Sequence, residues 1–493
     1  MNDFVFSMML LGALSSGGSL PFWAVSNKNG IMPEENGAVA YVSAYKPFDQ
    51  SRTFQWQAGA SLAASASFMP SLPGLDAEAP RLMVDELYAG VRWKVLRADL
   101  GMMHREREFL GSDPALGSLS VTEGHVVESN NARTMPGYKL VLEPWAVPFT
   151  DGHLLLSGIW GDYKTIDDRF VKGALVHRLR GMLTYDSRNH FYAGAGIDHY
   201  ALWGGVPSDP KYVPIEVNLS NYLRICTGRS ASPAGSRNDQ MNCLGDHGGA
   251  EQLRIGWRED KYEIAFQWEK PYNDKSGMRM NNFPDGVYTL HWSLKDKNSW
   301  VSDALVEVHY TMWQSGTIHE RETDADGNQI NWHKLDNDKK INIFGGDSYF
   351  TNGEYKSGWT HFGRPICGPL FFTSTSSAGI TTIGNNRYEA LHFGISGKLW
   401  RYAPYKLMLT ASRDYGTYSR PYISPSTWNS GWNWWEKNTI DKGLKQFSAA
   451  FIGFVPFRIG RRSSLDVVYG LYADSGELFQ EAFAGILGIR FNI

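Results

Sequence analysis

The segment from Glu251 to Asp274 constrains the fold most, because it has two stretches of strict alternation joined by a charged turn. Apolar side chains such as Trp257 and Trp268 point to one side of these stretches, and Arg254 and Glu263 point to the other. One face suits lipid and the other suits a wet interior. This two-sided pattern is typical of a transmembrane β-hairpin.

The same alternation recurs along the chain, at residues 86–95, 288–295, 305–312 and 483–493. The last of these stretches ends at the final residue. In a closed barrel that strand would still be covered, because it pairs with the first strand and leaves no free edge. We therefore predict an all-β fold, a single transmembrane antiparallel β-barrel.

Composition agrees with a barrel. The chain has 18 Trp, 24 Tyr and 25 Phe, and many of them fall at strand ends, where interfacial girdles need them. The mean hydropathy is −0.34, and no apolar run reaches the roughly 18 residues of a membrane-spanning helix. A net charge of −3 gives no reason to expect a nucleic-acid partner.

The apolar stretch Phe4–Leu14 has two interpretations. It could be the core of a signal peptide, but Asp3 precedes it and no Lys or Arg does. We therefore interpret it as the first mature strand, with any export signal missing from this sequence.

No linker divides the chain, so we expect one domain over residues 1–493. Short polar turns, such as 402–404 and 461–464, alternate with long connections at 206–249, 319–340 and 413–443. Outer-membrane barrels have short periplasmic turns and long extracellular loops. Within the first long connection, apolar residues from Ile215 to Cys226 have helical spacing. We predict a short helix there that covers or enters the lumen.

The three cysteines leave an alternative open. Cys226 and Cys243 flank a Gly/Ser/Pro-rich segment and could close a disulfide in an oxidising compartment. Two thiols are an equally good interpretation. Cys367, beside Gly368 and Pro369, is predicted to be buried.

Several motifs in order along the chain resemble those of the Wzi-like outer-membrane family of capsule assembly, in the branch found among Bacteroidetes. The motifs are Pro21-Phe22-Trp23 with Ser26-Asn27-Lys28-Asn29-Gly30, Asp198-His199 with Trp203-Gly204-Gly205, Thr311 with Gln314-Ser315-Gly316, Gly346-Asp347-Ser348-Tyr349 with Asn352, Tyr355, Gly358 and Trp359, and Asp414-Tyr415-Gly416-Thr417-Tyr418.

The resemblance implies a barrel of about 18 strands whose lumen is occluded by loops with short helical segments. It implies a lectin of the cell outer membrane that holds capsular or another surface polysaccharide, with lipid around it and no catalysis. We expect a monomer without a cofactor or metal.

Carbohydrate binding requires aromatic faces beside amides and carboxylates, and one loop is rich in both. The predicted glycan-binding residues are Trp428, Trp432, Trp434 and Trp435, together with Trp203 and Gln314. Packing of the loop onto the barrel rim is the alternative, since aromatic girdles use the same residues. We predict no catalytic residues.

Polar side chains on the inward face of the strands are expected to pair across the lumen. The predicted set is Asp198, His199, Arg254, Glu263, His291 and Glu307. If these groups paired they would close the pore, whereas a surplus of one sign would select ions. Two rival functions follow from the same strands. One is a porin or solute channel, and the other is a barrel-embedded hydrolase, for which no nucleophile motif accompanies the strand histidines.

Overall fold

The structure is a computed structural model. It describes residues 4–67, 81–233, 235–236, 239–240, 243–273, 275–314, 318–320, 340–342, 347–423, 442–461 and 463–493.

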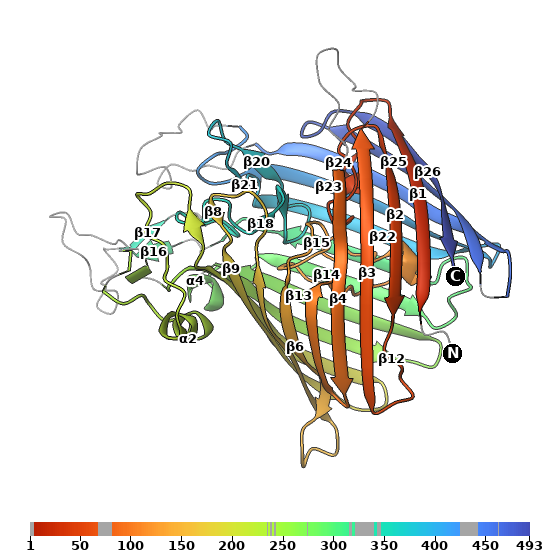
Figure 1. Cartoon of the computed structure of the whole chain (residues 1–493), viewed down its shortest axis with the longest axis horizontal. Helices are drawn as coiled ribbons and strands as arrows, with labels where there is room; N and C mark the ends of the chain where they lie inside the picture. Colours follow the sequence, from red (N-terminus) through yellow and green to blue (C-terminus); the bar gives the residue numbers. More distant parts are fainter. Residues whose placement is uncertain are drawn as a thin grey trace.

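Eighteen antiparallel strands form one closed barrel (Figure 1). Each strand pairs with its neighbour in the chain order of the barrel, and the last strand pairs with the first. The fold class predicted from the sequence is confirmed. In order, the barrel strands are β1 (Val5–Ser15), β2 (Gly37–Lys46), β3 (Phe54–Ser67), β4 (Arg81–Trp93), β5 (Leu96–Met102), β6 (Gly137–Ala146), β7 (Leu154–Lys164), β9 (Leu175–Asp186), β10 (Phe191–Trp203), β12 (Asp246–Arg258), β13 (Tyr262–Tyr272), β14 (Gly286–Leu294), β15 (Asp303–Tyr310), β22 (Arg387–Leu399), β23 (Ala403–Gly416), β24 (Leu444–Arg458), β25 (Ser464–Gly476) and β26 (Ala482–Asn492).

The remaining elements are short and lie in the connections. They are α1 (Phe22–Val25), η1 (Pro114–Leu116), α2 (Leu219–Thr227), α4 (Lys275–Met278), and the paired strands β8 (Val171–Lys172) with β11 (Val206–Pro207), β16 (Ile318–Glu320) with β17 (Lys340–Asn342), β18 (Thr360–His361) with β19 (Arg364–Pro365), and β20 (Thr373–Thr375) with β21 (Thr381–Ile383). None of the helices in the described ranges is long and apolar enough to cross a bilayer.

The two ends of the barrel differ. Both termini lie at one end, together with short turns such as 94–95 and 259–261, and the long connections lie at the other end, where Figure 1 places α2 and the small hairpins. Short turns mark the periplasmic end of such barrels and long loops mark the extracellular end. The apolar stretch at the N-terminus is strand β1, as predicted, and it pairs with β2 and β26.

Alternation along the strands places apolar side chains on the outside. On the β12–β13 hairpin, Ile255 lies opposite Phe266, and Arg258 lies opposite Glu263, as the sequence pattern predicts. Exposed apolar side chains encircle the barrel, among them Leu10, Val42, Leu87, Leu100, Leu140, Leu183, Leu290, Val306, Leu391, Leu471 and Leu487. A soluble protein would not expose so continuous an apolar surface, so lipid must cover it.

Exposed aromatic side chains lie where the strands reach their periplasmic turns, as expected for an interfacial girdle. They are Phe54, Trp93, Trp145, Tyr185, Phe191, Trp257, Trp300, Trp400, Tyr402 and Phe457. A closed barrel, an apolar outer wall and an aromatic girdle together make this chain an outer-membrane β-barrel.

Candidate functional site

The connection between β5 and β6, residues 103–136, lies inside the lumen, and we call it the plug. Its side chains are almost all buried from residue 116 onward, with Leu119, Val121 and Val126 fully so. The connection before β2 packs against it, since Asn27 Nδ2 donates to the carbonyl of Val121 at 2.9 Å. The connection before β22 does the same, and the indole Nε1 of Trp359 donates to the carbonyl of Val127 at 2.6 Å. Three extracellular connections thus form one body inside the barrel.

Polar side chains on the barrel wall hold the plug by its backbone. Glu307 accepts a hydrogen bond from the amide of Val121 at 2.8 Å, and Glu269 accepts one from the amide of Val126 at 3.0 Å. Further wall contacts reach the plug carbonyls: Gln267 Nε2 donates to Gly124 at 2.8 Å, Lys406 Nζ donates to Ser118 at 2.9 Å, and His392 Nε2 lies 2.8 Å from the oxygen of Leu119. These residues come from β13, β15, β22 and β23, which lie along one continuous arc of the barrel wall, so the plug is fixed to that arc at several points.

Ion pairs add to this attachment. On β9, Arg178 contacts Asp198 of β10 at 2.7 Å and also pairs with Glu128 of the plug. Glu128 in turn accepts from Arg105 Nε at 2.8 Å. On β12, Arg254 pairs with Glu108 of the plug. The side chains of Arg178, Asp198 and Glu128 are buried, and a buried ion pair breaks at a high cost if one partner is removed, whereas Arg254 and Glu108 stay partly exposed.

The pKa of His125 reflects its position in the plug. Burial lowers the pKa of His125 well below its ordinary value of 6.5, and the guanidinium groups of Arg180, Arg178 and Arg254 lower it further. The imidazole is therefore held neutral between cationic wall residues. Its Nδ1 makes no hydrogen bond within the described chain.

Five of the six residues predicted to face the lumen do so. Arg254 and Glu263 line a lumen cavity, Asp198 pairs with Arg178, and Glu307 binds the plug. His291 lies 3.5 Å from Asp303 on the same inner surface, and the ring of Phe109 from the plug packs against it.

The prediction for His199 is wrong. It follows Asp198 directly on β10, so alternation turns it to the outer face. There its ring nitrogens lie 3.1 Å from the hydroxyl of Tyr272 and 3.0 Å from Nδ1 of His247. The adjacent Asp-His pair in the sequence is therefore not one cluster in space.

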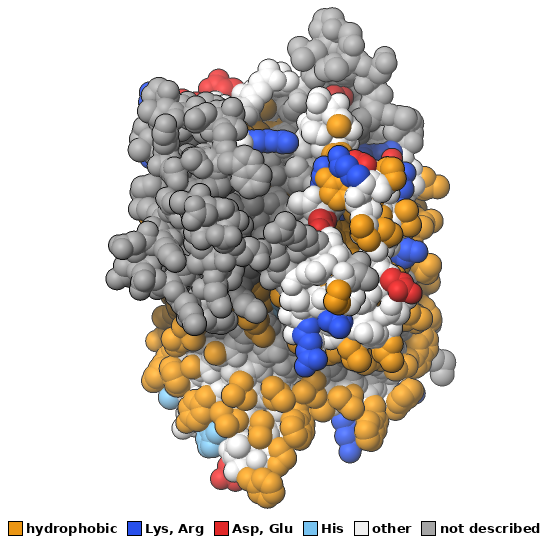
Figure 2. All heavy atoms as spheres, turned by 90° about the vertical axis from the view of Figure 1, so that its left-hand side faces the viewer, with side chains coloured by type: hydrophobic (Ala, Val, Ile, Leu, Met, Phe, Trp, Pro, Cys, Tyr) orange, Lys and Arg blue, Asp and Glu red, His pale blue; other side chains and the backbone are white. Residues whose placement is uncertain are grey.

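The helix predicted to cover or enter the lumen lies outside it. Helix α2 forms close to where the spacing predicted it, between the Asn218 N-cap and Gly228 in a left-handed conformation. Its Tyr222 donates to Asp162 at 2.8 Å, and Asp162 shares the outer face of β7 with the exposed Leu156. The helix therefore lies against the outside of the wall. Figure 2 shows apolar side chains gathered over the lower part of the face that carries it.

Two predicted glycan contacts are closed off within the fold. Trp203 is 4 % exposed and lies under Tyr222 of α2, with 5.8 Å between the ring centroids. Gln314 is 1 % exposed, and its amide donates to the carbonyl of Asn386 at 2.7 Å and accepts from the amide of Tyr349 at 3.0 Å. Both side chains stabilise extracellular connections, and neither can stack on or bond to a sugar as placed. The other four, Trp428, Trp432, Trp434 and Trp435, lie outside the described residues.

The cysteines are thiols in the described part of the chain. Cys226 lies on α2, and Cys243 Sγ lies 3.2 Å from the carbonyl oxygen of Gly228, just past the end of that helix. A disulfide between them stays a prediction for the oxidised protein, and non-reducing peptide mapping would detect it. Cys367 is buried, as predicted.

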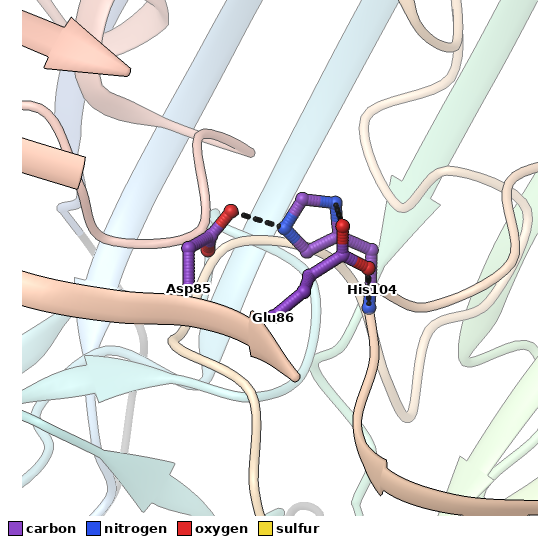
Figure 3. A group of neighbouring side chains, drawn as sticks. All are labelled: Asp85, Glu86 and His104. Atoms are coloured by element: carbon purple, nitrogen blue, oxygen red, sulfur yellow. Dashed lines mark hydrogen bonds and ion pairs between the residues drawn. The ribbon is translucent and has the colours of Figure 1, made fainter. Parts of the chain in front are cut away.

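A β-bulge creates one cluster that sequence alternation could not reveal. Pairing of β3 with β4 shifts between Ser61 and Leu62, so Asp85 and Glu86 both point inward. His104 lies between their carboxylates (Figure 3), with Nε2 2.7 Å from Asp85 and Nδ1 3.6 Å from Glu86. Their ligand atoms are close enough together to hold a metal ion. The hydrogen bonds of the cluster, including one from Tyr41 to Asp85, also satisfy it without an ion.

Comparison with solved structures shows the same architecture. Wzi of Escherichia coli, described as an outer-membrane protein involved in group 1 capsule assembly and a carbohydrate-binding β-barrel, is similar over 98 % of this chain and 83 % of its own, with a TM-score of 0.50 and 11 % identity. Pseudomonas aeruginosa OccK3 (OpdO) matches over 100 % and 96 %, with a TM-score of 0.46 and 9 % identity. The first likeness supports the fold alone. No protein-family model matches the chain, and no curated protein matches it by sequence.

Proposed function

We propose that this protein is a non-enzymatic outer-membrane barrel that attaches a surface polysaccharide to the cell. The observation that carries the proposal is the plug. Wall residues of four strands and ion pairs bind this segment, so it should remain in the lumen. A diffusion porin, in contrast, needs an open path through the lumen. A closed barrel in the outer membrane is best suited to present a surface outward.

Two further points support a glycan as the partner. The similar fold of Wzi belongs to a protein described as carbohydrate-binding, and the ordered motifs of this chain resemble that family. The loop with Trp428, Trp432, Trp434 and Trp435 offers aromatic faces beside Asn429, Asn433 and Glu436. Aromatic rings are the side chains that most often anchor interfaces.

The test is glycan retention on cells that carry Trp432→Ala with Trp434→Ala. We expect retained polysaccharide to fall, with free polysaccharide rising in the medium, while heat-modifiable electrophoretic mobility shows a folded barrel. Trp400→Ala is the matched control, because Trp400 lies in the periplasmic turn between β22 and β23. Normal retention by the folded double variant would remove this loop as the binding site.

A solute channel is the second candidate. One observation favours it: two cavities of about 570 and 560 Å³ lie inside the barrel on the periplasmic side of the plug. Plug residues line both cavities, Arg107 and Glu123 in one and Glu106 and Glu108 in the other, so a channel function would need a path past the plug. Conductance of the purified protein distinguishes the two candidates.

A further inference from the structure

The two cavities have similar size but different charge. The smaller, of about 560 Å³, is lined by guanidinium groups that face at least as many carboxylates. Arg97 lies 2.5 Å from Glu106, and Arg258 lies 2.6 Å from Asp186. We call it the balanced cavity, because its cations already have anionic partners. Its charged lining is Arg97, Arg180, Arg254, Arg258, Glu106, Glu108, Glu143, Asp186 and Glu263.

The larger cavity, of about 570 Å³, brings three cations together, and we call it the cationic cavity. A β-carbon on Gly117 would lie 3.1 Å from Nη1 of Arg107 and 3.8 Å from Nζ of Lys406, so these two groups flank one point of the plug. Lys28, from the connection that follows α1, lines the same cavity. Within the described chain, the ammonium of Lys28 makes no hydrogen bond or ion pair.

The carboxylates of this cavity do not neutralise the three cations. Glu123 is the carboxylate beside them, 3.8 Å from Nε of Arg107, and its other oxygen accepts two hydrogen bonds from Asn130 at 2.7 Å each. The other charged lining groups have partners of their own, since Asp85 bonds His104 and Arg490 bonds Asp466. Positive charge therefore remains in excess.

The pKa of Lys28 is consistent with this excess. Burial lowers the pKa of Lys28, and repulsion from Arg107 lowers it further, while Glu123 acts in the opposite direction. An anion placed among these groups would relieve the repulsion.

The other lining residues of the cationic cavity provide an aromatic surface and an opening at the periplasmic end. Trp23, Tyr41 and Tyr472 supply aromatic surface deeper in the barrel. Val5 and Asn492 line it at the periplasmic ends of β1 and β26, and both are partly exposed. A volume of this size is typical of sites for small molecules.

We propose that the cationic cavity binds a small anionic solute from the periplasm, one that carries a carboxylate or phosphate on a body the size of a sugar. Lys28, Arg107 and Lys406 hold the anionic group, and the aromatic side chains contact the ring. The site goes beyond attachment of a surface polysaccharide, because it opens at the opposite end of the barrel.

Isothermal titration calorimetry on the full chain in detergent tests the proposal. The probes are inorganic phosphate, D-glucuronate and glucose 1-phosphate, with glucose as the neutral probe. We expect an anionic probe to bind at least about tenfold more tightly than glucose, because hydrogen bonds to charged groups contribute more than neutral ones. Comparison of glucuronate with glucose 1-phosphate shows which anionic group the site prefers. Added salt should weaken the binding.

Matched variants locate the site. Lys28→Gln should weaken binding of the anion about tenfold or more, and Arg258→Gln in the balanced cavity should leave it within about twofold. Lys28 makes no bond that folding requires, and heat-modifiable mobility confirms folding of each variant. Absence of binding by every anion, equal binding of glucose, or full affinity in Lys28→Gln would overturn the proposal. Glycan retention on cells is measured separately, so failure of one proposal leaves the other standing.

Discussion

Two long extracellular connections of this barrel pack on opposite sides of its wall. The plug, residues 103–136, enters the lumen, and helix α2, in the connection that follows β10, lies against the outer wall. The plug has little apolar periodicity and is held by hydrogen bonds and ion pairs to inward polar residues. Helix α2 has a clear apolar face but leaves Leu219 72 % and Leu223 55 % exposed. The plug therefore packs in the polar lumen, where its polar groups find partners. The amphipathic helix α2 instead packs against the outer wall near the membrane interface.

The largest expected effect comes from removing each connection in turn. Replacing residues 108–130 by a short Gly-Ser linker should convert a non-conducting protein into one with discrete conductance steps in planar bilayers. The reason is that this change removes the plug segment that binds the wall residues inside the lumen. Deleting residues 210–240 should leave the protein silent. Heat-modifiable mobility must first show that both variants are folded. The reverse result, with conductance only after the second deletion, would assign the plug to α2.

Breaking a single wall contact should destabilise the plug by less. Glu307→Ala leaves the amide of Val121 without its acceptor, and we expect a loss of about 1.5–3 kcal/mol in the free energy of unfolding by urea. Glu263→Ala is the control, since Glu263 faces the balanced cavity and, among the described residues, accepts a hydrogen bond from Tyr192 only. It should cost under about 1.5 kcal/mol. Equal losses in the two variants would mean that Glu307 does not anchor the plug.

Lowering the pH should destabilise the plug and leave the stability of α2 unchanged. The pKa of His125 is lowered by burial and by three guanidinium groups, so the unfolded chain binds a proton here at higher pH than the folded chain. Stability is then complete above about pH 6.5 and falls as the pH drops below it. The protection factors for hydrogen exchange of residues 116–135, corrected for the intrinsic pH dependence of amide exchange, should fall between pH 7 and pH 5, and His125→Asn should reduce that change. Protection factors in the plug that are independent of pH would contradict the role of His125.

The smallest effect is expected at α2. Leu219→Ser with Leu223→Ser removes exposed apolar surface that no part of the described chain covers, so the free energy of unfolding in detergent should change by less than about 0.5 kcal/mol per residue. Urea unfolding measures this change. A loss of several kcal/mol would show that these side chains pack into the fold after all.

The strands could be predicted well because alternation is a local signal. The positions of Trp257, Arg254 and Glu263 on their faces follow from period two alone. The plug could not be predicted, because its burial depends on wall residues distant in sequence, such as Glu307 and Lys406. The prediction for His199 is wrong because Asp198 and His199 are consecutive on a strand, and consecutive side chains point to opposite faces of the barrel wall. The cluster of Asp85, Glu86 and His104 depends on a bulge, which leaves no clear mark in the sequence.

Ion conductance of the unmodified protein tests the central claim of a closed barrel most directly. Purified full-length chain inserted in planar bilayers at pH 7 should show no steady current, because the plug remains bound to the wall. Insertion is verified with the variant that lacks residues 108–130, which should conduct under the same conditions. A steady open-channel current from the unmodified protein would contradict the closed barrel and favour a solute channel.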